Sequence, residues 1–265
     1  FNGTEFFTCS TGAKINKIDF ETGSIITSFK IPNNEISGLL YLNEKILIAS
    51  CENGDIYIID PNTSKIINNI KTSQDICTII CDNDLKKLVF SSGLGQVHAY
   101  STNKWKLIDT SDKQDDEYTC SAFFQNKSKI LFGSSNSNGR FCSYNVGEWG
   151  NPTEYIYTGT SSIDHLVSFD DKTLIFASSD GFVGSYGLFP SHLLGYYADN
   201  STDIISGLSL SCDKQILMSS TESGLNFWNT EKDLLLKGKC TKSSKKINAY
   251  SIIKAANIKN FFEDL

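Results

Sequence analysis

Short apolar runs divided by polar turns recur along the whole sequence. Between residues 36 and 70 four such runs follow one another: ISGLLYL (36–42), KILIASC (45–51), DIYIID (55–60) and SKIINNI (64–70). The second run is apolar on both faces and ends in small residues, which is typical of a strand covered on both sides. The third run alternates more clearly. The pattern predicts sheets of short strands.

The same pattern repeats at a nearly constant interval. Successive glycines in the turn after the second run of each set lie 41 to 44 residues apart. They are Gly12, Gly54, Gly95, Gly139, Gly181 and Gly224. Such a period, containing only β-type runs, is typical of WD-type propeller blades, each a four-stranded antiparallel sheet. We therefore predict an all-β, WD40-type β-propeller, with the strands of each blade named a to d outward from the ring axis.

The repeats also predict how many blades are present. The first set begins at its strand b, EFFTCST (5–11), and the sixth ends with DLLLKG (233–238) as its strand d. A propeller closes to avoid an open edge, so we expect at least the start of a blade, and a whole further blade, before Phe1 in the native protein. The prediction is seven native blades, about six of them here. Residues 1–240 would form the propeller with an incomplete first blade, and 241–265 a tail.

The segment from Glu52 to Asp55 is either an acidic site or a turn. A calcium loop needs oxygen ligands over about 12 residues, whereas here the next strand begins at once. Asn53 and Gly54 suit the positive φ of tight hairpins, so we predict a b–c turn. The Gly-His and Trp-Asp dipeptides of well-formed WD repeats are absent from the sequence, and packing is therefore expected to hold the blades together.

Composition narrows the class of protein. The chain has 265 residues, 40% of them hydrophobic, and a net charge of −6, so it can fill a core but has no overall basic surface for nucleic acid. Eight cysteines lie mostly inside apolar runs without a CxxC pair, which predicts buried reduced thiols and a reducing compartment. No apolar run is long enough for a membrane span, and no signal peptide is visible.

Candidate catalytic groups are few. His98 falls in a predicted strand c, His165 near the start of a strand a and His192 in a c–d turn, and none lies in a nucleophile motif. The Gly93-x-Gly95 pair is not followed by a helical pattern, so a dinucleotide turn is not expected. We predict structural histidines, no catalytic, cofactor or metal site, and no enzymatic activity.

Charge is unevenly placed. In a propeller the b–c turns and d–a loops share one face, and here this face collects thirteen acidic residues against four basic ones. The acids predicted to bind a partner are Glu35, Glu52, Asp55, Asp75, Asp164, Asp180, Asp203 and Glu222; the others are Asp112, Asp115, Asp116, Glu117 and Asp199. The basic residues are Lys14, Lys71, Lys113 and Arg140. Either turns simply prefer acidic residues, or this face docks a basic peptide or ribosomal-protein tail.

The C-terminal tail has its own pattern. A basic stretch that includes Lys245 and Lys246 precedes apolar residues at near-helical spacing, which end with Phe261, Phe262 and Leu265. This pattern predicts a short C-terminal helix. The helix could pack on its own propeller, or it could insert its aromatic pair into a partner while the lysines contact RNA phosphate.

The later repeats resemble the WD repeat-containing protein 55 family. The motifs that carry the resemblance are Ser162-Ile163-Asp164, Ser178-Ser179-Asp180-Gly181, Pro190 through Leu193-Leu194-Gly195, GLNFWN (224–229) and NFFEDL (260–265). They cover roughly the last 110 residues of the sequence. Upstream, the resemblance rests on the order of the blades alone.

The resemblance implies a function that the residues alone do not. Family members are non-enzymatic nucleolar scaffolds of large-subunit ribosome biogenesis and ribosomal RNA processing, so the implied location is the nucleus and nucleolus. The implied partners are assembly proteins, with RNA contact through the tail, and neither a membrane nor a small-molecule substrate. The alternative is a substrate receptor of a cullin-RING ubiquitin ligase, or another WD-repeat adaptor. Such receptors dock through Trp-Asp-x-Arg, and here that segment reads Trp228-Asn229-Thr230-Glu231.

Overall fold

The computed structural model describes residues 4–10, 12–32, 35–72, 74–82, 84, 86–136, 138–199, 203–231 and 235–236. They form two compact units: unit 1 is the chain up to Thr119 together with Gly147–Pro152, and unit 2 is Cys120–Val146 with the residues from Thr153 onward. The regular elements of the described residues are all β-strands, and a helix able to cross a membrane is absent from these ranges.

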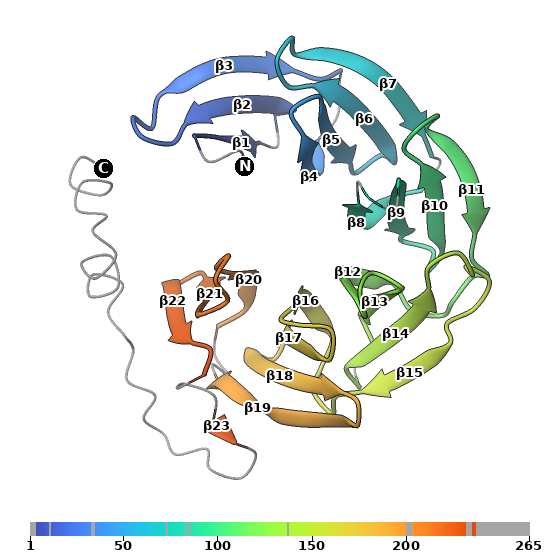
Figure 1. Ribbon diagram of the computed structural model, residues 1–265, viewed down its shortest axis with the longest axis vertical. Coiled ribbons are helices and arrows are strands. Elements are labelled where there is room, and N and C mark those ends of the chain that lie inside the picture. Colours follow the sequence, from blue (N-terminus) through green and yellow to red (C-terminus); the bar gives the residue numbers. More distant parts are fainter. Residues whose placement is uncertain are drawn as a thin grey trace. The chain divides into compact units, whose positions relative to one another are not determined.

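Unit 1 contains three antiparallel sheets (Figure 1). The first consists of β1 (Glu5–Cys9), β2 (Lys14–Asp19) and β3 (Ile25–Lys30). The second consists of β4 (Ile36–Asn43), β5 (Ile46–Cys51), β6 (Asp55–Asp60) and β7 (Lys65–Lys71). The third consists of β8 (Ile76–Asp82), β9 (Lys87–Ser92), β10 (Val97–Ser101) and β11 (Lys106–Thr110).

Unit 2 also contains three antiparallel sheets. The first consists of β12 (Tyr118–Phe124), whose first two residues belong to unit 1, β13 (Lys129–Ser134), β14 (Arg140–Asn145) and β15 (Glu154–Tyr157). The second consists of β16 (Ile163–Ser168), β17 (Thr173–Ser178), β18 (Phe182–Leu188) and β19 (Ser191–Asp199), with β23 (Leu235–Leu236) added at its edge. The third consists of β20 (Ile205–Leu210), β21 (Ile216–Thr221) and β22 (Gly224–Asn229).

The sheets are the predicted WD-type blades. Apart from β23, the strands of each sheet are hydrogen-bonded in chain order, and the first strands of neighbouring blades lie side by side, as β4 does with β8 and β16 with β20. The first sheet has three strands, as expected if β1 takes position b. Its partner across the blade interface supports this assignment, since β1 contacts β4 as β5 contacts β8.

Burial confirms the prediction for strand b and corrects the one for strand c. In β5, β9, β13 and β17 every residue after the first is buried. The c strands were expected to alternate, but the four central residues of β6 and β14 are all buried. Strand c is paired along both edges, and consecutive buried residues show that both its faces are covered. Burial alternates along the whole of β12, a strand a, and over the first residues of β10, a strand c.

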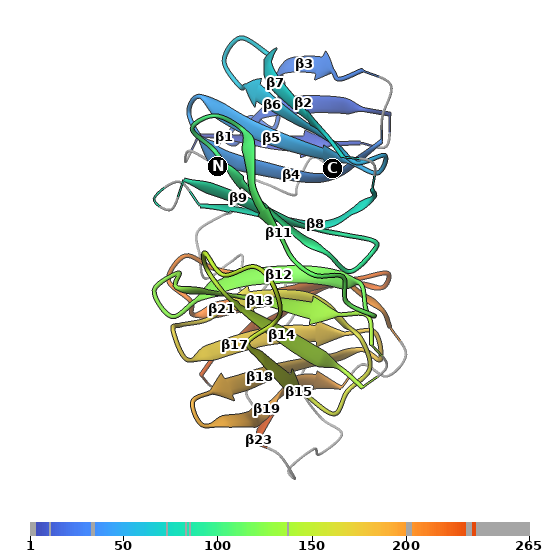
Figure 2. The ribbon, with the colours of Figure 1, turned by 90° about the vertical axis from the view of Figure 1, so that its right-hand side faces the viewer.

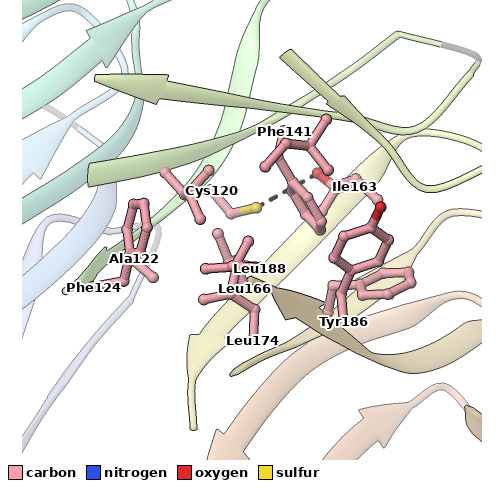
Figure 3. Close-up of a cluster of buried hydrophobic side chains, with 12 residues drawn as sticks. Cys120, Ala122, Phe124, Phe141, Ile163, Leu166, Leu174, Tyr186 and Leu188 are labelled. Atoms are coloured by element: carbon pink, nitrogen blue, oxygen red, sulfur yellow. Dashed lines mark hydrogen bonds between the residues drawn. The ribbon is translucent and has the colours of Figure 1, made fainter. Parts of the chain in front are cut away.

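The hydrophobic core lies between adjacent blades. In unit 2 the ring of Phe141 in β14 contacts the rings of Phe176 in β17 and Tyr186 in β18 edge to face, with centroids 5.7 and 5.8 Å apart (Figure 3). Cys120 of β12 lies in the same cluster and directs its thiol to the carbonyl of Ile163, 3.6 Å away. Such edge-to-face packing adds about 0.5–1.5 kcal/mol per pair beyond the burial of area.

Glycine is required in the b–c turns. Gly54 has a φ of +87°, and its N–H donates to the carbonyl of Cys51 at 3.0 Å. Asn53 was expected to share the positive φ but does not. The turn is therefore a three-residue loop that ends in one left-handed glycine.

A short loop of the fourth blade completes unit 1. Residues 147–152 connect β14 to β15, yet they belong to unit 1. The carbonyl of Gly150 accepts a hydrogen bond from the backbone N–H of Asp112 at 2.7 Å, and Asn151 Nδ2 donates to Asp112 Oδ2 at 2.7 Å. Trp149, between glycine-rich neighbours, is only 1% exposed. This loop, assigned to unit 1, thus carries a large aromatic side chain that is fully buried.

The last strand lies elsewhere than predicted. DLLLKG was expected to be strand d of the sixth blade, but its residues Leu235 and Leu236 form β23, which pairs antiparallel with β19 of the fifth blade. Figure 2 shows β17, β18, β19 and β23 side by side. The sheet β20–β21–β22 has three strands among the described residues. The predicted helical tail, 241–265, lies outside those residues, and its boundary stays a prediction.

Candidate functional site

The predicted acidic residues of unit 1 lie at one end of the blades. Glu35 directly precedes β4, and Glu52 lies in the turn between β5 and β6. The backbone N–H of Glu52 donates to the carbonyl of Glu35 at 3.1 Å, and that of Gly93 donates to the carbonyl of Asp75 at 3.0 Å. These bonds hold each d–a loop against the b–c turn of the same blade. The structure therefore brings Glu35 and Glu52 together, as the sequence predicts.

Two acids of this end are engaged in local structure. The carboxylate of Asp55 accepts hydrogen bonds from Asn53 Nδ2 and from the Tyr57 hydroxyl, both at 3.3 Å. Asp112 is held by Asn151, as described above. These two carboxylates stabilise a turn and a loop, which is the role that turn preference alone would give them.

Five other acids of unit 1 are exposed, and their carboxylates make no hydrogen bond or ion pair with the described residues. These open carboxylates are Glu35, Glu52, Asp75, Asp115 and Glu117. The pKa of the Cys77 thiol is raised by burial and then by the negative charges of Glu117 and Asp75. Two open carboxylates that precede successive blades thus act on the same thiol. The basic residues Lys71 and Lys113 at this end are also exposed.

In unit 2 the predicted acids are more tightly held. Asp180 Oδ2 accepts from the backbone N–H of Ser161 at 3.1 Å, and its Oδ1 accepts from the Ser178 hydroxyl. Asp164 Oδ1 accepts from the Ser162 hydroxyl at 3.0 Å. Burial raises the pKa of Asp164, the charge of Asp180 raises it further, and the Ser162 hydrogen bond opposes both. The serine partners were not predicted, although the spacing Ser-x-Asp at both acids was the available signal.

The remaining predicted residues of unit 2 make contacts separate from those of Asp164 and Asp180. Asp203 Oδ2 accepts from the Ser223 hydroxyl at 2.7 Å, and Glu222 is exposed in the turn between β21 and β22. The Arg140 guanidinium carbon lies 4.7 Å from the centroid of the Tyr155 ring, so this cation stacks on the outer strand β15. The side chain of Asp199 and the tail residues Lys245, Lys246, Phe261, Phe262 and Leu265 lie outside the described part of the chain.

The histidines occupy structural positions. His98 in β10 stacks on Phe90, with ring centroids 4.9 Å apart, and its Nδ1 lies 3.2 Å from the Thr110 hydroxyl. His165 lies in β16, as predicted. His192 was placed in a turn, but it is the second residue of β19. Within the described ranges, no three His, Cys, Asp or Glu side chains gather in a group that could hold a metal ion.

His98 makes stability depend on pH. Burial lowers the pKa of His98, and its Nε2 is buried without a hydrogen-bond partner in the described structure. The unfolded side chain, with a pKa of about 6.5, therefore binds a proton that the folded one does not, so stability falls as the pH drops through the window below about 6.5. We expect the free energy of unfolding, measured with urea, to fall more between about pH 7.5 and about pH 5.5 in the wild type than in His98→Gln. An equal loss in both proteins would contradict this assignment.

The cysteines are only partly as expected. The seven described cysteines are free thiols, but only Cys51, Cys120 and Cys142 are buried, whereas Cys9, Cys77 and Cys212 are exposed. Cys9 is the last residue of β1, and Cys77 lies in β8, which is a strand a. At such positions an apolar run in the sequence does not mean that both faces of the strand are buried. Burial, and then the charge of Asp55, raises the pKa of Cys51 to about 12.

Comparison with known proteins places these blades among WD-repeat proteins. A protein of Dictyostelium discoideum named WD repeat-containing protein 55 homolog is 28% identical over 229 residues, covering 86% of this chain and 55% of that protein. Homologs of the same name from Drosophila willistoni and Drosophila melanogaster are 25% and 24% identical, cover 100% of this chain, and are themselves covered over 53% and 54%. The chain thus spans about half the length of the curated relatives it matches. No protein-family model matches it. The chain is therefore homologous along its length to the proteins named WD repeat-containing protein 55 homolog, and its blades are of the WD type.

Proposed function

We propose that the protein is a non-enzymatic WD-repeat scaffold that assembles proteins during nucleolar large-subunit ribosome biogenesis and ribosomal RNA processing. The WD-type blades and the homology to the WD repeat-containing protein 55 homologs support the scaffold role. The motifs from Ser162 to Gly195 and at the C-terminus support the process and the nucleolar location by family resemblance. Fold alone does not assign a process, so the proposal is built to be tested at the level of partners.

One observation points to the kind of partner. The five open carboxylates gather at the b–c and d–a end of the blades in unit 1, while the acids of unit 2 are mostly used internally. Exposed carboxylates without internal partners are available to a cationic ligand, and complementary charge accelerates its encounter and sets its register. The proposed ligand of this end is a lysine- or arginine-rich peptide, such as the tail of a ribosomal protein. The basic tail, with Lys245 and Lys246, would add contacts to RNA phosphate.

Affinity purification with matched variants tests this proposal. The test variant reverses four open carboxylates: Glu35→Lys, Glu52→Lys, Asp75→Lys and Glu117→Lys. The control variant reverses four exposed acids at the other end of the blades: Glu21→Lys, Glu44→Lys, Glu154→Lys and Glu231→Lys. We expect wild type and control to capture large-subunit assembly factors, and the test variant to capture them at least about tenfold less, because like charges would face each other. Capture by the wild type should also weaken as salt is raised.

The possible outcomes separate the parts of the proposal. Capture of a cullin adaptor without pre-ribosomal proteins would overturn the ribosomal role and favour a ubiquitin-ligase receptor. In this chain the tryptophan of the docking segment is not accessible to an adaptor, because Trp228 is only 8% exposed and packs in the core of unit 2. Equal capture by the test and control variants would overturn the acidic docking end while leaving the scaffold role intact.

A further inference from the structure

The outermost strands of four blades share a β-bulge at the same position. In β3, β7 and β11 of unit 1 the extra residue is Ile26, Ile67 and Ile108, and in β19 of unit 2 it is Leu194. The first three are spaced 41 residues apart and are 48%, 55% and 50% exposed. A bulge that recurs at one place in a repeat is a built feature that re-aims side chains at a sheet edge.

The residue after the bulge caps the edge in β7 and β11 but not in β3, where it is Thr27. In β7 the side chain of Asn68 accepts the backbone N–H of Asn69 at 2.8 Å. In β11 the side chain of Asp109 accepts the backbone N–H of Thr110 at 2.9 Å. An edge strand presents its outward N–H groups to any added strand, and these two side chains occupy one such donor in each blade. Both edges are thereby capped from within.

The corresponding position of β19 cannot cap itself. It is Gly195, which has no side chain to accept the N–H of the next residue, Tyr196. At this point β23 is added: Gly195 pairs with Leu236 and Tyr196 pairs with Leu235. The one uncapped edge among β7, β11 and β19 is thus the one that carries an extra strand.

The outer strands without an added strand also differ from β19 in how many of their large hydrophobic side chains are exposed. Eight exposed large hydrophobic side chains lie on outer strands that have no added strand in the described chain: Ile25, Ile26, Ile66, Ile67, Leu107, Ile108, Tyr155 and Tyr157. The described side chains of β19 contribute none. Yet β23 pairs with only two of the nine residues of β19. The outer edge of β19 is therefore covered only by a short β-ladder with few backbone hydrogen bonds.

We propose that the outer edge of β19 is a docking edge for an extended partner segment with two adjacent aliphatic residues, and that Leu235–Leu236 covers this edge until such a segment displaces it. The chain's own occupant defines the chemistry: an antiparallel strand with free backbone N–H groups and a Leu-Leu pair. Strand addition of this kind takes its affinity from main-chain hydrogen bonds and its specificity from the side chains. The proposal is independent of the acidic docking end, and either can fail without the other.

The test uses the full chain and a labelled peptide of residues 231–238, EKDLLLKG. Leu235→Pro with Leu236→Pro removes the N–H groups of the internal strand and should raise peptide affinity at least about tenfold over wild type, since an internal competitor with a high effective concentration is lost. Adding Gly195→Asn, which installs the residue found at position 68, should abolish the gain. A peptide with prolines in place of its leucines at 235 and 236 should not bind.

Hydrogen–deuterium exchange locates the binding. Amides of residues 193–197 should exchange faster in the double-proline variant and regain protection with the peptide. Equal peptide affinity for wild type and double-proline variant, or protection of β22 in place of β19, would overturn the proposal. Thermal unfolding checks that each variant is folded; should Gly195→Asn unfold the protein, the proline peptide and the exchange pattern decide the question by themselves.

Discussion

Replacing Trp149 with alanine is expected to lower the free energy of unfolding by about 3–5 kcal/mol. The side chain is 1% exposed, and its Nε1 has no hydrogen-bond partner among the described residues, so the loss is one of apolar volume in a closed interior. The loop that carries it is anchored by backbone and side-chain bonds to Asp112, which limits collapse into the cavity. Urea unfolding followed by circular dichroism measures the change.

Asn151→Ala is the matched control for this prediction. It removes the side-chain bonds of the same loop, Asn151 Nδ2 to Asp112 and Gln114 Nε2 to Asn151, but leaves the tryptophan in place. Exposed hydrogen bonds of this kind contribute about 1 kcal/mol. A Trp149→Ala cost no greater than that of Asn151→Ala would mean that the loop does not complete the core of unit 1.

Gly95→Ala is the second change with a large expected effect, about 3 kcal/mol or more. Gly95 has a φ of +70°, and a Cβ there would lie 2.5 Å from the carbonyl oxygen of Gln114 and 2.6 Å from that of Asp116. Both oxygens are backbone atoms of the d–a loop, so they can yield only if the loop moves. The expected cost therefore adds displacement of the loop to the strain of a left-handed alanine, which is about 1–2 kcal/mol.

Gly159→Ala separates these two causes. Its φ is +77°, close to that of Gly95, but a Cβ there has no neighbour within 4 Å. We expect it to cost about 1–2 kcal/mol, the conformational part alone. Thermal or urea unfolding of both variants gives the difference. Equal costs would show that the b–c turn and the d–a loop are not packed against each other as tightly as the structure indicates.

The repeat was predictable because its signals are local. A left-handed glycine such as Gly54 or Gly95 is demanded by the turn itself, so the period of the blades appears directly in the sequence. The burial of β6 and β14 was not predictable, because it depends on neighbouring blades that cover both faces of strand c. The exposed thiol of Cys77 shows the converse, since an apolar run can still leave one face of strand a uncovered.

The placement of β23 was also beyond sequence reasoning. The regular spacing of the runs assigned Leu235 and Leu236 to the sixth blade, whereas in the structure they pair with Gly195 and Tyr196 of β19. The difference between Gly195 and the capping residues Asn68 and Asp109 becomes visible only when the three strands are aligned through the bulge. For the acids of unit 1, turn position predicted that Glu35 and Glu52 lie together, but not that Asp55 and Asp112 are occupied by internal hydrogen bonds.

The loop at 147–152 has a consequence for the order of events during synthesis. A chain grows from its N-terminus, and domains generally fold as their residues emerge. Unit 1 contains all residues up to Thr119, but it also contains Gly147–Pro152, which are made only after β12, β13 and β14 of unit 2. Its interior therefore stays incomplete while those strands are being made. Unit 1 is therefore not one continuous stretch of the polypeptide: a cut after Thr119 would leave the N-terminal fragment without Trp149 and the rest of its loop.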